Sequence, residues 1–218
     1  MKFLRNLPIR LKLIFSHGLI ALMALSVAIF GIVGIQMSAY RMQTMQEGSL
    51  AATEAIGDVM YAAADLQLVM TTIISLPASK ADRLPGLEAS MNSDVATMAS
   101  AAQSLYTSMA DQPEIQGLIE DIGTLIATSG DQRNAVLEMK DNGDASGAYM
   151  LYDSGYSVTL KQIQTDAAEL KTHIHNISIE EYNAALATNN IVNIVMLAVT
   201  ILALAIGVVL AAQVSNAV

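Results

Sequence analysis

Leu13–Ile35 reads LIFSHGLIALMALSVAIFGIVGI, a run of 23 residues without Asp, Glu, Lys or Arg. A helix needs about 20 apolar residues to cross a bilayer. A second run, Ile191–Ala212, reads IVNIVMLAVTILALAIGVVLAA. It lies within residues 182–218, which contain no Asp, Glu, Lys or Arg. The two runs predict transmembrane helices at 13–35 and 191–212, with a separate domain at 36–190 between them.

Each run has one alternative interpretation. The basic residues before the first run would suit a cleaved signal peptide, but the apolar part of a signal peptide is only about 7–15 residues long, and no A-x-A-like site follows this run. The second run would otherwise be a buried helix of a soluble core, which rarely needs an unbroken apolar segment of this length. Transmembrane helices are therefore favoured for both runs.

The charges are segregated along the chain. All 20 acidic residues and seven of the 11 basic residues lie between Arg41 and Glu181, which gives this segment a net charge of −13 against −9 for the whole chain. The other basic residues are Lys2, Arg5, Arg10 and Lys12. Because cytoplasmic flanks are rich in Lys and Arg, residues 1–12 and 213–218 are predicted to be cytoplasmic and 36–190 periplasmic, in a bacterial inner membrane. The acidic balance argues against a nucleic-acid partner, and the absence of cysteine argues against a disulfide scaffold.

The segment 36–190 has the apolar spacing of helices, with steps of three and four residues. The clearest ladder is Tyr149, Tyr152, Tyr156, Leu160, Ile163, Ala167, Leu170, Ile174 and Ile177. Pro77 and Pro85 bracket a turn, Pro113 begins another helix, and Asp144 is placed to cap the last one. The predicted helices are 36–76, 84–110, 113–141 and 145–190. Short turns make neighbours antiparallel, so the expected fold is all-α: a membrane-anchored up-down-up-down four-helix bundle flanked by two transmembrane helices.

Catalytic and metal-binding patterns are missing from the sequence. His173 and His175 are two residues apart on a helix and point in different directions, so they cannot share a metal ion, and Glu169 is placed to pair with His173 on the surface. No cysteine, nucleophile motif or phosphate-binding loop is present. The sequence therefore predicts neither an enzyme nor a cofactor or metal site.

Two stretches resemble a known family. Asn6–Leu13 follows the pattern N-L-x-I-R-x-K-L, and Lys140–Leu160 reads KDNGDASGAYMLYDSGYSVTL. With two spans around four helices, they resemble the sensory, N-terminal half of a bacterial methyl-accepting chemotaxis protein with a four-helix-bundle ligand-binding domain. The resemblance implies a homodimer in which ligand binding outside shifts the last helix relative to the first. The family continues into a HAMP linker, but Gln213–Val218 lacks the usual basic residue and proline, so a fragment or a truncated receptor is expected.

The ligand is expected to differ from that of the aspartate- and serine-sensing relatives. Those proteins hold a ligand carboxylate with arginines of the first outer helix, whereas the only arginine of that helix here is Arg41, close to the membrane. The net charge of −13 favours a cationic or neutral small molecule, or a partner such as a periplasmic binding protein.

The candidate ligand-binding residues are Tyr61, Asp65, Tyr152, Tyr156 and Arg133. Counting helix turns from the predicted bend near residue 143 brings Tyr152 and Tyr156 level with Asp65, where they would form an aromatic, anionic pocket suited to an amine or quaternary ammonium ion. Tyrosines in a helical seam are also common core residues, and Arg133 would then simply neutralise Asp65.

The leading hypothesis is a chemoreceptor module that binds an extracellular signal and transmits it across the membrane by helix displacement. Two alternatives remain open at this point. The same module also precedes sensor histidine kinases and cyclases, and a non-sensory membrane scaffold would have a similar layout.

Overall fold

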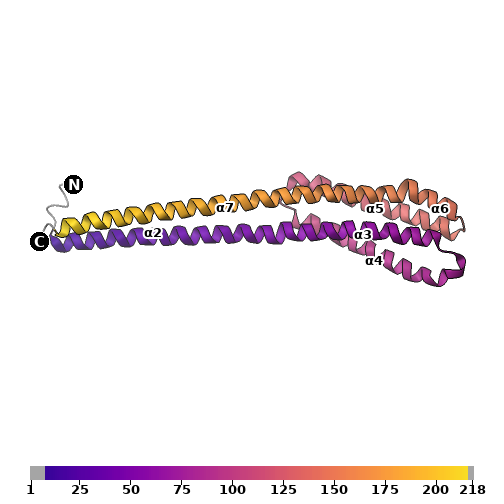
Figure 1. The fold of residues 1–218 in the computed structure, drawn as a ribbon, viewed down its shortest axis with the longest axis horizontal. Helices are drawn as coiled ribbons and strands as arrows, with labels where there is room; N and C mark the ends of the chain where they lie inside the picture. Colours follow the sequence, from indigo (N-terminus) through magenta and orange to yellow (C-terminus); the bar gives the residue numbers. More distant parts are fainter. Residues whose placement is uncertain (1–7, 216–218) are drawn as a thin grey trace. The chain divides into compact units, whose positions relative to one another are not determined.

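The computed structural model describes residues 8–215, which form helices and turns. The predicted cytoplasmic ends include residues 1–7 and 216–218, which lie outside the described residues. The chain divides into two compact units: unit 1 comprises Met1–Gln43 and Glu180–Val218, and unit 2 is Thr44–Ile179. The elements, shown in Figure 1, are α2 (Ile9–Thr44), the π-helical turn η1 (Met45–Leu50), α3 (Ala51–Ser75), the 3₁₀ turn η2 (Ala78–Arg83), α4 (Leu84–Ser108), α5 (Pro113–Asp141), α6 (Ala145–Leu151), the π-helical turn η3 (Tyr152–Tyr156) and α7 (Ser157–Ser215).

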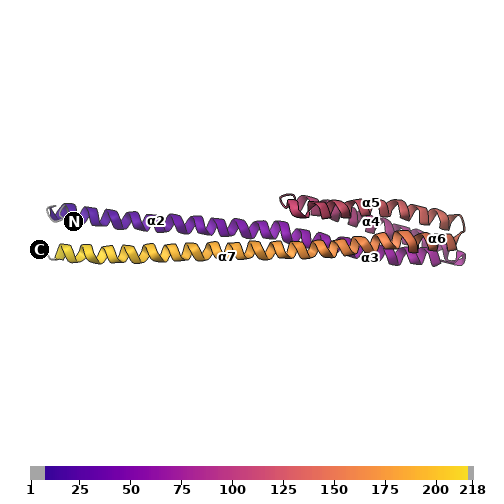
Figure 2. The ribbon, with the colours of Figure 1, turned by 90° about the horizontal axis from the view of Figure 1, so that it is seen from above.

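Unit 2 is a bundle of four antiparallel helical segments, and the all-α prediction is confirmed. α4 lies along α3, while α5 lies along α6 and η3 (Figures 1 and 2). The second and third predicted helices, 84–110 and 113–141, agree with α4 and α5 to within two residues. The fourth segment consists of α6, η3 and the first part of α7, and it begins at Ala145 as predicted.

The end of α3 is determined by a proline and a lysine. Leu76 has extended backbone angles (φ −66°, ψ 120°), as expected for a residue that precedes proline, here Pro77. Lys140 at the end of α5 donates from Nζ to the carbonyl oxygens of Ile74 (2.7 Å) and Leu76 (3.2 Å). A cation thus satisfies carbonyls that the end of a helix leaves without partners.

The turn into the fourth segment has the predicted cap. Gly143 has φ of +84°, a left-handed conformation that glycine adopts without a steric penalty. Asp144 follows, and its Oδ1 accepts a hydrogen bond from the backbone N–H of Gly147 at 2.8 Å. This is the expected role of an aspartate at a helix N-terminus.

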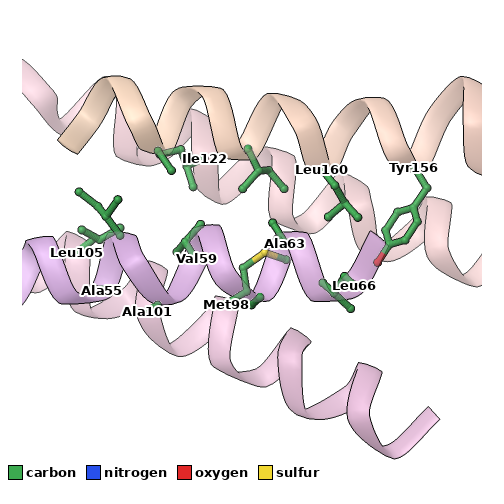
Figure 3. Packing of buried hydrophobic residues seen from close by; sticks show 14 of the residues in the cluster. Ala55, Val59, Ala63, Leu66, Met98, Ala101, Leu105, Ile122, Tyr156 and Leu160 are labelled. Carbon is green, nitrogen blue, oxygen red and sulfur yellow. The ribbon is translucent and has the colours of Figure 1, made fainter. Parts of the chain in front are cut away.

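The core of unit 2 is the predicted seam of apolar side chains. Figure 3 shows Tyr156 and Leu160 pointing toward Leu66 and Ala63 of α3, and all four side chains are buried. From the fourth-segment ladder, the buried residues are Tyr152, Tyr156, Leu160, Ile163, Ala167, Leu170 and Ile174. Burying one side chain the size of leucine contributes about 1.5–3 kcal/mol, so this seam is the main source of bundle stability.

Unit 1 pairs α2 with the later part of α7 and has an apolar exterior. Gly34 is buried at a point where the two helices approach closely. A Cβ built at Gly34 would lie only 2.6 Å from Cγ1 of Val192. Large apolar side chains such as Ile35 (71% exposed) and Val208 (69% exposed) face outward instead. By length and composition, two helices of the described chain are able to cross a membrane, and they include residues 17–35 and 191–209 of the two predicted runs.

Candidate functional site

Partnerless polar atoms gather in unit 2. Among the described residues, six buried side-chain nitrogen or oxygen atoms have no hydrogen-bond partner, and one of them is Ser38 Oγ. The other five are Gln67 Nε2, Asp94 Oδ2, Gln132 Oε1, Arg133 Nη1 and Tyr156 Oη. We define the polar cluster as these five residues together with Asp65 and Tyr152. A buried polar atom without a partner is unfavourable, so five in one region indicate a site.

The two tyrosines of the polar cluster come from the π-helical turn η3. Their ring centroids are 6.3 Å apart in an edge-to-face arrangement, and the Tyr152 hydroxyl donates to the backbone oxygen of Gln67 on α3 at 3.4 Å. Tyr156 is only 1% exposed, and burial raises its pKa, while the charge of Arg133 lowers it in part. Single π-helical turns inside α-helices are frequent at functional sites. The spacing of apolar residues in the sequence does not predict this turn.

Asp65 of α3 and Asp94 of α4 form a carboxyl pair, and both residues are half-buried. Burial is the main cause that raises the pKa of Asp94 from 3.8 to about 6, and the neighbouring carboxyl group of Asp65 contributes to the rise. Two adjacent carboxylates disfavour the doubly ionised state. Asp94 was not among the predicted site residues. Its position between Met91 and Met98, which are both buried, nevertheless places it at a seam position of α4.

Arg133 lies beside Tyr156 and not in an ion pair with Asp65. Its Nε and Nη2 donate to Oδ1 of the adjacent Asn134 at 3.4 and 3.2 Å, and within residues 8–215 no ion pair joins it to an aspartate. The preceding residue, Gln132, packs on η3, because a Cβ built at Gly155 would be 3.6 Å from its Nε2. The predicted charge neutralisation of Asp65 by Arg133 is therefore not a direct contact.

Of the five predicted site residues, Tyr152 and Tyr156 are in direct contact. The charges of Arg133 and Asp94 act electrostatically on the Tyr156 hydroxyl, and Asp65 influences Asp94 in the same way. Tyr61 is 71% exposed, so its side chain lies at the surface of α3 and apart from the buried atoms of the polar cluster.

Residues 6–188 match the family of four-helix-bundle sensory modules for signal transduction. The chain belongs to this family. The match agrees with the resemblance to the sensory half of a methyl-accepting chemotaxis protein. The family is described as a sensory module for signal transduction and not as a catalytic domain. No curated protein and no solved structure matches the chain.

The polar cluster contains hydrogen-bonding groups that are not used within the chain. Arg133 Nη1 and Gln67 Nε2 are unused donors, Asp94 Oδ2 and Gln132 Oε1 are unused acceptors, and the Tyr156 hydroxyl can do both. No group of three or more His, Asp or Glu side chains suited to a metal ion occurs in the described part of the chain. The unused groups come from all four helical segments, so a molecule bound to them would contact the whole bundle.

Proposed function

We propose that this sensory module is the signal-binding and membrane-crossing part of a chemoreceptor, with unit 2 outside the bacterial inner membrane. α2 and the later part of α7 would cross the bilayer, and ligand binding in unit 2 would displace α7 relative to α2. Helix continuity supports this proposal most strongly. Tyr156 is followed directly by α7, which stays helical for 59 residues up to Ser215 and includes the second apolar run. α7 therefore contains no non-helical segment that would absorb a displacement starting at the polar cluster.

The expected ligand is a small organic cation or a neutral molecule rich in hydrogen-bonding groups. With both aspartates ionised, Asp65, Asp94 and Arg133 sum to one negative charge, which a single cation would balance. The tyrosine rings add an aromatic surface on which cations bind favourably. The net charge of −13 on residues 36–190 would concentrate cations near the module, and a periplasmic binding protein is the alternative partner.

We further propose a homodimer that uses an exposed face of α3 and of Leu50, the last residue of η1, which has helical backbone angles. Leu50, Tyr61 and Leu68 are 57%, 71% and 65% exposed, and they are spaced by eleven and seven residues, so they lie on one helical face. Apolar side chains in such a stripe favour pairing with a second helix, here α3 of another copy.

The membrane orientation is testable with single cysteines, because the chain contains none. In intact cells with a permeable outer membrane, we expect a membrane-impermeant maleimide to label Asn142→Cys, which is exposed in the turn before Asp144, but not Lys2→Cys. After cell lysis both variants should be labelled. Labelling of Lys2→Cys alone in intact cells would show the opposite orientation.

Ligand binding is testable with a panel of amines, guanidines and quaternary ammonium ions, measured by calorimetry and by thermal shift of the full chain in detergent. For any cation that binds the wild type, Asp65→Asn should weaken affinity by at least about 30-fold, because it removes a partly buried charge partner while keeping the side-chain shape. Asp58→Asn is the matched control, since Asp58 is an exposed acid on the same helix. Equal affinity in Asp65→Asn would exclude this site as the place where the cation binds.

A further inference from the structure

A cavity of about 510 Å³ lies between the beginning of the first helical segment of unit 2 and α7. Its described lining residues all belong to unit 2. The volume falls in the range of about 300–1,000 Å³ that is typical of pockets for small molecules. Its polar lining side chains are those of Ser49 and Thr53 on η1 and α3, and those of Lys171, Thr172, His175 and Ser178 on α7.

The ionisable side chains at this cavity are basic. Lys171 and His175 are one helical turn apart on α7, so they lie on the same face of the helix. In the part of the chain that the structure describes, neither side chain makes an ion pair or a hydrogen bond. The Lys171 ammonium has three unused donors, and the imidazole of His175 adds a ring N–H donor, with a positive charge when it is protonated. None of the described residues that line the cavity is acidic.

The carboxylates nearest in sequence are engaged elsewhere. Glu169 pairs with His173 on the surface of α7, with Oε1 at 3.9 Å from Nε2. Glu54 follows Thr53 in the sequence, but it lines a groove between α3 and α4. The cavity is therefore locally positive, although residues 36–190 carry a net charge of −13. The charge of Lys171 remains available for an anionic ligand.

Ser49 adds a buried donor that the protein does not use. The residue is only 6% exposed, and its hydroxyl makes no hydrogen bond to another residue that the structure describes. The hydroxyls of Thr53 and Thr172 differ in this respect, because they donate to the backbone oxygens of Ser49 (2.7 Å) and Ala168 (3.1 Å). A buried donor without a partner is unfavourable, so an acceptor placed in the cavity would stabilise the Ser49 hydroxyl.

We propose that this cavity binds a small organic anion, whose carboxylate or phosphate group accepts hydrogen bonds from Lys171, His175 and Ser49. The site is separate from the polar cluster and has the opposite charge preference. Hydrogen bonds in which both groups are charged are among the strongest in proteins, so Lys171 would contribute most to affinity. The volume of the cavity exceeds what an inorganic ion needs, which favours an anion that carries an organic part.

The expected anion is soluble and is not the headgroup of a membrane lipid. Ile191, the first residue of the second predicted span, lies 13 residues after Ser178 on the continuous helix α7. At 1.5 Å per residue this is about 20 Å of helix. The headgroup region of a bilayer adds only about 5–8 Å on each side of the hydrocarbon core, so a lipid phosphate would not reach the cavity. This choice rests on the proposed span at 191–212, whereas the anion site itself does not.

A bound anion would also affect the proposed signal. Ser49 belongs to η1 and Lys171 belongs to α7, so one anion held by both would connect the first and last helical segments of unit 2. We have proposed that α7 is displaced when the module responds, and such a connection would oppose that displacement. This effect rests on the proposed function, but binding of the anion is measurable without it.

The test measures binding to the full chain in phosphatidylcholine nanodiscs by calorimetry. The probes are phenyl phosphate and benzoate, with inorganic phosphate as the anionic group alone. We expect saturable binding of phenyl phosphate or benzoate, with inorganic phosphate binding more weakly. Lys171→Gln should weaken this binding at least about tenfold, and Ser49→Ala about threefold or more. Lys161→Gln is the matched control, because Lys161 is an exposed lysine of α7 that does not line the cavity.

The absence of saturable binding of both organic probes at concentrations up to about 10 mM would overturn the proposal. So would unchanged affinity in both Lys171→Gln and Ser49→Ala. In phosphatidylglycerol nanodiscs at about 0.15 M salt, where surface charge is screened, we expect the same affinity. A tenfold loss there would show that lipid headgroups compete for the cavity, which contradicts a soluble anion as its ligand. Asp65→Asn should leave anion binding unchanged, so failure of the cation site and failure of the anion site are distinguishable.

Discussion

Replacing Tyr156 by alanine is expected to lower the free energy of unfolding by about 3–5 kcal/mol, as for other buried aromatic side chains. The ring is 1% exposed and packs edge-to-face on Tyr152, with Leu66 and Leu160 nearby (Figure 3). Removing it would leave a cavity at the level where all four helical segments meet. Urea unfolding of the full chain in detergent, followed by far-ultraviolet circular dichroism, measures the loss.

Tyr156→Phe is the control that separates the ring from its hydroxyl. Because the hydroxyl is buried without a protein partner, its removal should leave the free energy of unfolding unchanged or raise it by up to about 1–3 kcal/mol. A loss above about 1 kcal/mol would contradict this expectation and would mean that the hydroxyl is already hydrogen-bonded, for example to water. If Tyr156→Phe folds normally but binds a ligand more weakly, the hydroxyl contributes to recognition and not to the core.

The helical framework of unit 2 was predictable because local chemistry determines where its helices end. Pro77 forces extended backbone on Leu76, Pro113 begins α5, and Gly143 with Asp144 makes the last turn. These effects act within a few residues and are visible in the sequence. The burial of Tyr156 was also predictable, because three- and four-residue spacing places it in the same seam as Leu160.

The composition of the polar cluster was only partly predictable, because it depends on how each helix is rotated within the bundle. Asp94 occupies a seam position of α4, but the sequence does not indicate which residue of α3 it meets. Tyr61 and Asp65 are one helical turn apart, yet the boundary of burial falls between them, with Tyr61 71% exposed and Asp65 half-buried. The π-helical turn η3 has no sequence signature comparable to a proline or a cap.

Replacing Gly34 by leucine is expected to destabilise the pairing of α2 with α7 in unit 1 by about 1–3 kcal/mol, the usual effect of overpacking. A Cβ at Gly34 would lie 2.6 and 2.9 Å from the two Cγ atoms of Val192, too close for any real contact. Valine is stiff in a helix, so its methyl groups cannot rotate away easily. The backbones must separate instead, and in lipid such close packing is itself what holds helices together.

Cysteine cross-linking measures this pairing directly in the otherwise cysteine-free chain. A Cβ at Gly31 would be 3.6 Å from Cε, the end of the Met196 side chain, so a short bifunctional thiol reagent should join cysteines at these two positions. We expect Gly34→Leu to reduce cross-linking by about tenfold, the equivalent of roughly 1.4 kcal/mol. Gly18→Leu, on the same helix but with no atom within 4 Å of its Cβ, should have little effect.

Adding Val192→Ala to Gly34→Leu removes the opposing methyl groups and should restore much of the cross-linking. Without this recovery, the effect of leucine would not come from the contact with Val192, and the packing of unit 1 would need another explanation.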